Sequence, residues 1–249
     1  MRTNMRTRFL TSAALVLLIA IGALAWASSS SEASPGLTVE DLSGPLAPTD
    51  LADALVGTGI TISNVSYTGA DVAAGTFTGG SGIIGFESGI ILSSGSIVNV
   101  VGPNASDSVT TINKTPGDAD LTELSGFGTL DAAVLEFDFV AEASPVSFQY
   151  VFASDEYNEF VHSEFNDVFA FLVNGVNCAT VPMTGQPVSV NTINAGNPFG
   201  SDPQENPELY RNNDLDDDGG SIDTEMDGLT TVLTCEASVG FRAANHLKL

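Results

Sequence analysis

The sequence predicts an all-β fold, a β-sandwich or jelly roll with one short helix near its N-terminal end. Glycine and proline account for 25 and 11 of the 249 residues, and they interrupt the chain too often for a helical bundle. Apolar side chains recur with a period of two over several short segments, as expected of half-buried strands. Turn-forming residues such as the pair Asn174-Gly175 separate these segments.

The first 27 residues have the three parts of a secretory signal peptide. Three arginines stand among the first eight residues, an apolar run covers residues 9–26, and Ala25-Trp26-Ala27 forms a small-x-small cleavage site. An uncleaved membrane anchor is the alternative, because the apolar run is just long enough to span a bilayer. Cleavage after Ala27 predicts a secreted or cell-surface protein that keeps no transmembrane segment.

The rest of the chain is expected to hold one domain. Residues 28–47 are rich in serine and proline and are interpreted as a linker, so the domain covers residues 48–249. Its short helix is predicted over residues 51–56, since Thr49 or Asp50 can cap the start and Gly57 can end it. Residues 99–120 are expected to form a long polar loop. Strands are predicted at residues 60–67, 89–92, 135–139, 146–152, 168–173, 188–190 and 229–233.

The charge excludes several classes of function. The chain has 7 basic and 31 acidic residues, and removal of the signal peptide leaves 4 basic residues and a formal net charge of −27. Such a protein does not bind nucleic acid through a basic groove or dock on anionic lipid. Two histidines, with no serine-hydrolase, zinc-protease or phosphate-loop motif, predict no catalytic residue. Like charges at this density repel, so divalent cations or salt outside the cell would stabilise the fold.

Cys178 and Cys235 are the two cysteines of the chain. An exported protein with two cysteines most simply forms one disulfide, and two buried free thiols are the alternative. The sequence therefore predicts a Cys178–Cys235 disulfide.

The sharpest local motif is an acidic loop near the C-terminal end. Asp214, Asp216, Asp218 and Glu225, with Gly219 between them, follow the calcium-loop spacing D-x-D-x-D-G-x5-E. Calcium takes six to eight oxygen ligands, which alternate aspartates and a distal glutamate can supply. No amphipathic helices flank the loop, so a helix–loop–helix calcium site is not expected. We predict a Ca²⁺ site at these four carboxylates, with a solvated acidic loop as the alternative.

A second acidic cluster lies between two predicted strands and has no lysine or arginine near it in the sequence. Asp155, Glu156 and Asp167 are its candidate metal ligands. Paired carboxylates also serve glycosidases, which place two acids a few ångströms apart. A metal site, a catalytic pair and an ordinary polar loop all remain open for this cluster.

An ordered series of motifs resembles the choice-of-anchor L domain, a family of exported bacterial surface proteins. The resemblance covers about residues 48–249. It is carried by Asp50–Gly57, Gly59–Gly69, Gly75–Gly95, Val100–Asn104, Pro116–Leu121, Leu135–Val140, Phe148–Phe160, Phe165–Phe171 and Ile222–Thr230. The family is defined by export and by anchoring signals that differ between members, so the resemblance implies a location and no ligand or activity.

Two departures from the family pattern lie near the C-terminal end. No sorting signal of the Leu-Pro-x-Thr-Gly type is present, and the stretch Gly240-Phe-Arg-Ala-Ala differs from the usual pattern. The departures raise the hypothesis that the family's sequence continues beyond Leu249.

Taken together, these patterns predict an exported, non-catalytic β domain that serves adhesion, matrix building or ligand display and is stabilised by Ca²⁺. Its expected partner is a cell-surface or matrix component, such as a glycan. The alternatives are a calcium-dependent carbohydrate-binding module and an extracellular hydrolase with paired carboxylates.

Overall fold

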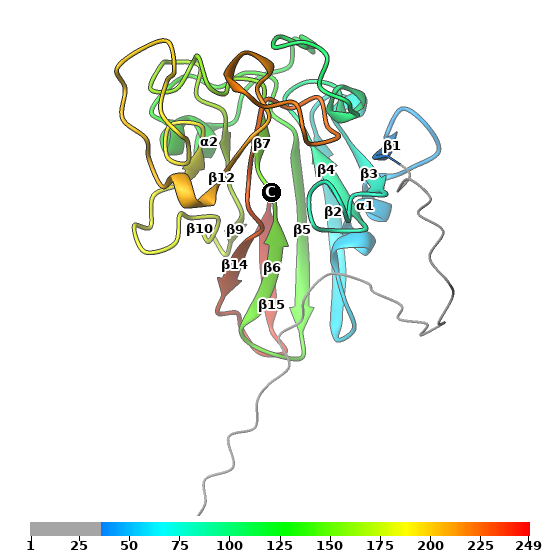
Figure 1. Cartoon of the computed structure of the whole chain (residues 1–249). Helices are drawn as coiled ribbons and strands as arrows, with labels where there is room; N and C mark the ends of the chain where they lie inside the picture. Colours follow the sequence, from blue (N-terminus) through cyan, green and yellow to red (C-terminus); the bar gives the residue numbers. More distant parts are fainter. Residues whose placement is uncertain (1–35) are drawn as a thin grey trace, which may run out of the picture.

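A computed structural model describes residues 36–249, and Figure 1 shows antiparallel strands with two short helices. The predicted all-β class is confirmed. The predicted signal peptide at residues 1–27 lies outside the described residues.

The largest sheet has five strands in the order β10-β9-β15-β5-β2. Their bounds are β2 Ile60–Thr68, β5 Val134–Ala141, β9 Leu172–Val173, β10 Val176–Asn177 and β15 Ala244–Lys248. In β5, Leu135, Phe137 and Phe139 are buried, whereas Glu136 and Asp138 are partly exposed on the other face. This alternation is the half-buried pattern that the sequence predicts for residues 135–139.

A strand pair packs over this sheet and completes the sandwich (Figure 1). The pair consists of β6 Val146–Tyr150 and β14 Leu233–Ala237. Phe148 of β6 lies against Phe171 beside β9, with 4.4 Å between the ring centroids. Both rings belong to the main core, which also holds Cys235, Leu247 and the side chains of β5.

The first helix, α1 Pro48–Leu55, covers one end of this core. Proline occupies its first turn, and the Asp50 carboxylate accepts a hydrogen bond from the Ala47 amide at 2.7 Å. Leu51 and Ala52 are fully buried. Because the helix buries only one face, its eight residues depend on the sheet for stability.

The N-terminal strands correct the predicted linker. A small sheet has the order β1-β3-β4, with β1 Thr38–Asp41, β3 Ala74–Thr78 and β4 Ser88–Leu92. The strand β1 lies inside residues 28–47, so the linker interpretation is wrong for these four residues. Gly75 allows the close pairing, since a Cβ there would lie 2.0 Å from the Glu40 carbonyl oxygen.

A second helix, α2 Ala119–Ser125, corrects the prediction of a single helix. The Asp118 side chain caps it by accepting from the amides of Asp120 and Leu121, and Gly126 ends it with a φ of 75°. Lys248 of β15 lies 2.7 Å from a carboxylate oxygen of both Asp118 and Asp120. These contacts join α2 to the C-terminal strand.

The expected central strand at residues 168–173 is divided into two. Val168–Phe169 form β8, which pairs with β11 Val188–Ser189, whereas β9 belongs to the five-stranded sheet. The chain therefore changes sheets between these two strands, at Ala170 and Phe171.

The remaining sheet lies next to the acidic residues Asp155 and Asp227, which follow β7 and precede β13. It has the order β12-β13-β7, with β7 Ala153–Ser154, β12 Tyr210–Asn212 and β13 Gly228–Thr230. Long loops gather at this end of the domain, the upper part of Figure 1, while the short β5–β6 turn lies at the opposite end.

Candidate functional site

Two aspartates face each other directly after the last residue of β7 and directly before the first residue of β13. In this antiparallel pair Gly228 lies opposite Ser154 and Leu229 opposite Ala153. The next position of the same register sets Asp227 opposite Asp155. Side chains directly opposite in an antiparallel pair share one face, with Cβ atoms about 4.5–5.5 Å apart. The fold therefore brings together two carboxylates that are 72 residues apart in the sequence.

A fully buried tyrosine packs against this strand pair. The Tyr157 ring packs directly over Gly228, where a Cβ would lie 2.4 Å from a ring carbon. Its hydroxyl donates to the Ile193 carbonyl at 2.8 Å, so the buried polar atom has a partner. A larger residue at position 228 would displace the tyrosine and, with it, the ends of both strands.

The loop that follows Val100 docks against the acidic loop. Gly102 permits the approach, because a Cβ there would lie 2.4 Å from the Asp223 carbonyl carbon. The Thr224 hydroxyl donates to the Val100 carbonyl at 2.6 Å. The docked loop places Asn104, whose Nδ2 donates to the Asp227 Oδ1 at 2.8 Å.

Asn213 organises the acidic loop around this contact. Its Nδ2 donates to the carbonyls of Thr224 and Met226, both at 3.0 Å, and its Oδ1 accepts from the Ile222 amide at 2.8 Å. Its own carbonyl accepts from the Asn104 Nδ2 at 2.9 Å. One buried asparagine thus holds both arms of the loop and joins them to Asn104.

The four residues of the predicted calcium loop fall into two groups. Asp214 and Glu225 are buried, and their carboxylates accept backbone hydrogen bonds: Asp214 from the Asp216 amide at 2.8 Å, Glu225 from the Ala105 amide at 2.9 Å. Asp216 and Asp218 are exposed. In residues 36–249, no three or more histidine, cysteine, aspartate or glutamate side chains are grouped so that they could hold a metal ion. The structure therefore does not bring these four carboxylates together around one point.

The weaker candidates do not form one group of ligands either. They are Asp155, Glu156 and Asp167. The Asp167 carboxylate accepts from the Ser154 hydroxyl at 2.8 Å, and that hydroxyl oxygen accepts from the Glu156 amide at 3.0 Å. Asp167 and Glu156 thus fix the β7 end, whereas Asp155 faces Asp227.

Burial raises the pKa of three carboxylic acids at this place. It raises the pKa of Asp155 to about 8, with a further contribution from the Asp227 charge. Burial also raises the pKa of Asp227 to about 7, although the hydrogen bond from Asn104 opposes the shift. The pKa of Glu156 rises to about 7 through burial and then through the Asp167 charge.

Three oxygens at this place are buried and have no hydrogen-bond partner among the described residues. They are Oδ1 of Asn104, Oδ1 of Asp155 and Oδ2 of Asp227. The Tyr150 hydroxyl is the fourth such side-chain atom in residues 36–249. Sequence reasoning missed Asn104 and Asp227, since Asn104 stands over a hundred residues from Asp227 and neither belongs to the calcium spacing.

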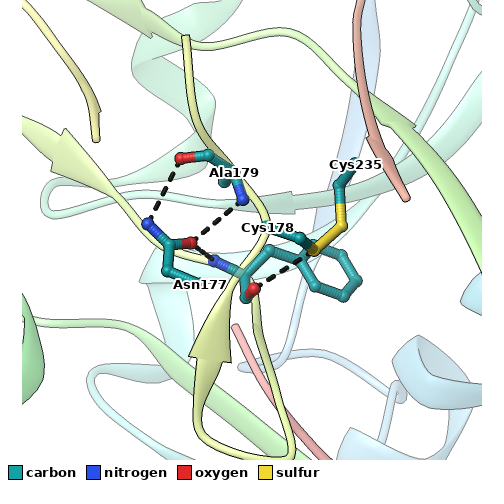
Figure 2. The surroundings of a disulfide bond; sticks show 5 residues. Asn177, Cys178, Ala179 and Cys235 are labelled. Atoms are coloured by element: carbon teal, nitrogen blue, oxygen red, sulfur yellow. Dashed lines mark hydrogen bonds between the residues drawn. A yellow bond between two sulfur atoms is a disulfide. The ribbon is translucent and has the colours of Figure 1, made fainter. Parts of the chain in front are cut away.

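The predicted disulfide is confirmed, and Figure 2 shows its surroundings. Cys178 and Cys235 have Cα atoms 5.1 Å apart, within the range that a disulfide spans. The Asn177 side chain accepts from the amides of Phe171 and Ala179, both at 3.0 Å, and so holds the backbone on either side of Cys178. The bond joins β14 to the end of β10 and thus ties the two layers of the sandwich.

Two surface depressions lie away from the aspartate pair. An open one of about 320 Å³ is lined by residues that include Thr68, Pro116 and Glu136. A much smaller one of about 10 Å³ lies beside Lys248. Neither is lined by Asp155 or Asp227.

Comparison with known proteins identifies the family. The sequence profile of the choice-of-anchor L domain matches residues 42–249, most of the chain and all but a few of the residues described above. The chain belongs to the choice-of-anchor L domain family. The resemblance seen in the sequence motifs is confirmed, and choice-of-anchor L domains are extracellular domains of exported bacterial surface proteins. No curated protein and no solved structure matches the chain. In residues 36–249 no helix is long and apolar enough to cross a membrane.

Proposed function

We propose that this choice-of-anchor L domain is a non-catalytic binding domain, which uses its loop end for adhesion, matrix building or ligand display outside the cell. The observation that carries the proposal is an exposed aromatic pair at that end. Phe160 and Phe165 are 36% and 55% exposed, and their rings meet edge to face with centroids 5.2 Å apart. Exposed aromatic side chains are frequent binding anchors, because they offer a large contact area with few rotatable bonds.

The loops around this pair are held together. The Asn197 Nδ2 donates to the Glu159 carbonyl at 2.7 Å, next to Phe160 in the chain. The His162 Nε2 lies 3.0 Å from the Pro203 carbonyl oxygen. Phe199, which is 66% exposed, follows on the second loop. A rigid loop end loses little entropy on binding, which favours a role in recognition.

The proposal includes no catalytic step at the aspartate pair. Asp227 is fully buried, and neither described depression reaches it. A polysaccharide must contact both carboxylates of a glycosidase, so burial of one acid argues against a hydrolase at this place.

The exposed aromatic pair also favours a second candidate, a carbohydrate-binding module, because sugar rings present apolar faces that aromatic side chains can contact. A glycan array and a panel of matrix polysaccharides test both candidates with the purified secreted protein. We expect the double substitution Phe160→Ser with Phe165→Ser to abolish binding. The matched control is Val176→Ser, which removes another exposed apolar side chain (69% exposed) from β10. Equal loss in both variants would contradict a binding role for the loop end, and the absence of any bound glycan or matrix component would contradict the proposal itself.

A further inference from the structure

We infer that Oδ1 of Asn104, Oδ1 of Asp155 and Oδ2 of Asp227 bind one calcium ion, which fastens the loop after Val100 to the ends of β7 and β13. The inference does not depend on what the loop end binds. It also differs from the spacing-based prediction, because none of these three residues belongs to the set Asp214, Asp216, Asp218 and Glu225.

The first support is that three buried acceptors without partners belong to residues that the fold brings together. Asn104 and Asp227 are more than nine-tenths buried, and the Asn104 side chain is hydrogen-bonded to Asp227. The register of β7 and β13 sets Asp155 opposite Asp227. Each residue nevertheless retains a buried oxygen without a partner among the described residues. Native proteins rarely leave such atoms unpaired, and a bound ion is one explanation when they do.

The orientation of Asn104 is fixed by its partners, so the unpartnered atom is its oxygen. The Nδ2 faces two acceptors, the Asn213 carbonyl and the Asp227 Oδ1. A flipped amide would set its oxygen against both of these acceptors, which is unfavourable. The carbonyl oxygen of the amide is therefore the atom left without a partner, and it stays available as a ligand.

The second support is the local charge. Like charges directly opposite each other on two strands destabilise the pair. In residues 36–249 the ion pairs involve Lys248 and, when it is protonated, His246, and both residues lie on β15. Arg211 instead donates to the Ile83 carbonyl at 2.8 Å. No basic side chain of the described chain therefore neutralises Asp155 or Asp227 in an ion pair.

Two further carboxylates add to the negative charge that has to be neutralised at this place. The charge of Glu225 contributes to the raised pKa of Asp155, and that of Asp214 contributes to the raised pKa of Asp227. A divalent cation between the two aspartates would offset this repulsion and occupy all three oxygens at once. A proton shared by the aspartates is the rival explanation, and the experiment below separates the two.

The ligand chemistry favours calcium over other divalent ions. The three atoms are carboxylate and amide oxygens, which hard cations prefer, whereas zinc and copper sites use imidazole or thiolate. Both histidines have other partners: His162 contacts Pro203, and His246 contacts Glu136 and Asp138. Calcium accepts irregular sets of six to eight oxygens that include water and carbonyls, while magnesium demands a near-ideal octahedron.

The test begins with the secreted wild-type protein, stripped with a chelator and titrated with CaCl₂ alone by calorimetry. We expect one ion per chain, with a Kd in the range of extracellular calcium modules, about 10⁻⁴–10⁻³ M or tighter. This arm needs no variant and so remains decisive even where a substitution prevents folding. Failure to bind calcium at millimolar concentration would overturn the inference.

The second arm compares melting temperatures in chelator, CaCl₂, MgCl₂ and NaCl of equal ionic strength. We expect calcium to raise the melting temperature more than the other salts, and Asp155→Asn with Asp227→Asn to remove that increment. The matched control is Asp216→Asn with Asp218→Asn, the same change of charge at two exposed residues, which should keep the increment. Loss in the control alone would place the ion in the Asp214–Glu225 loop. Equal responses to all salts would indicate screening, and a response to acid but not to calcium would indicate a shared proton; each result refutes the inference.

Discussion

The Cys178–Cys235 disulfide should supply a large part of the stability of the folded domain. Its two sulfurs join residues 57 positions apart. Cys235 is fully buried in the main core, and Cys178 packs against that core from the end of β10. Reduction would therefore free β14 from the five-stranded sheet without changing the composition of the core.

The expected size of the effect follows from the length of the closed loop. The chain-entropy relation for a separation of 57 residues gives about 4 kcal/mol at 25 °C. In a domain of this size each kcal/mol shifts the melting temperature by about 2–4 °C, so the disulfide should contribute about 8–16 °C. This stabilisation is an upper limit, because residual structure in the reduced unfolded chain lowers the conformational entropy that the disulfide removes.

The assay compares oxidised protein with protein that has been reduced in denaturant and refolded under reducing conditions. The variant Cys178→Ala with Cys235→Ala is the control, and its melting temperature should not respond to reductant. Denatured, unreduced protein from the extracellular medium should contain no titratable thiol. Two titratable thiols, or equal melting temperatures of oxidised and reduced protein, would refute the reasoning.

Three further predictions concern the strands and the helix. Hydrogen bonds to Asp138 and then to Glu136 raise the pKa of His246 above 6.5. The loss of stability in His246→Gln should therefore be largest below about pH 6 and should vanish as the pH rises through the pKa of His246 in the folded protein. Equal losses in thermal melts at pH 5.5 and pH 9 would contradict this. Gly75→Ala should cost about 1–3 kcal/mol in urea denaturation by forcing β1 off β3, whereas Gly82→Ala, where a Cβ meets nothing within 4 Å, should cost little. Leu51→Ala should cost about 2–5 kcal/mol because Leu51 is fully buried, while Leu130→Ala, at a side chain 77% exposed, should change the denaturation midpoint little.

Local periodicity was sufficient to predict the long strands and the first helix. Residues 135–139 alternate apolar and polar side chains and lie in a strand with one buried face, and residues 60–67 lie in a strand whose apolar face is partly buried, with a β-bulge between Ser63 and Ser66. The α1 helix was predicted in the right place but begins at Pro48, three residues before the expected start, so Thr49 and Asp50 lie in its first turn and Ala47 is the N-cap. These elements are predictable because each one is specified by side chains within a single turn or a single strand.

Prediction failed where pairing partners decide the structure. The run 168–173 is apolar throughout, so periodicity could not reveal that β8 and β9 join different sheets. The strand β1 has four residues in a Ser/Pro-rich stretch, and its partner β3 lies more than thirty residues away. For α2, the cap Asp118 and the ending Gly126 were visible in the sequence. The helix was missed because its seven residues hold one apolar pair, Leu121 and Leu124, which is too short a pattern to distinguish a helix from a loop.

The aspartate pair was beyond prediction for a related reason. Asp155 was recognised as an acidic candidate, but its neighbour Asp227 becomes one only through the register of β7 and β13. Asn104 arrives through a loop that Gly102 allows to approach Asp223 closely. A ligand spacing along the chain identifies sites within one loop, and this site is assembled from three segments.

The disulfide and the proposed calcium site make the same physical demand on the environment. A disulfide persists only in an oxidising compartment, and the bond joins the two layers of this sandwich. Asp155 and Asp227 repel each other unless they bind a proton or a cation, and calcium modules of moderate affinity fill only where the ion reaches millimolar concentration. Inside the cell the chain would therefore lack both contributions, and its high negative charge would still oppose compaction. The domain therefore acquires its full stability only after export, in the environment where a surface domain works. Before export the chain is less compact, and it crosses the membrane in that state.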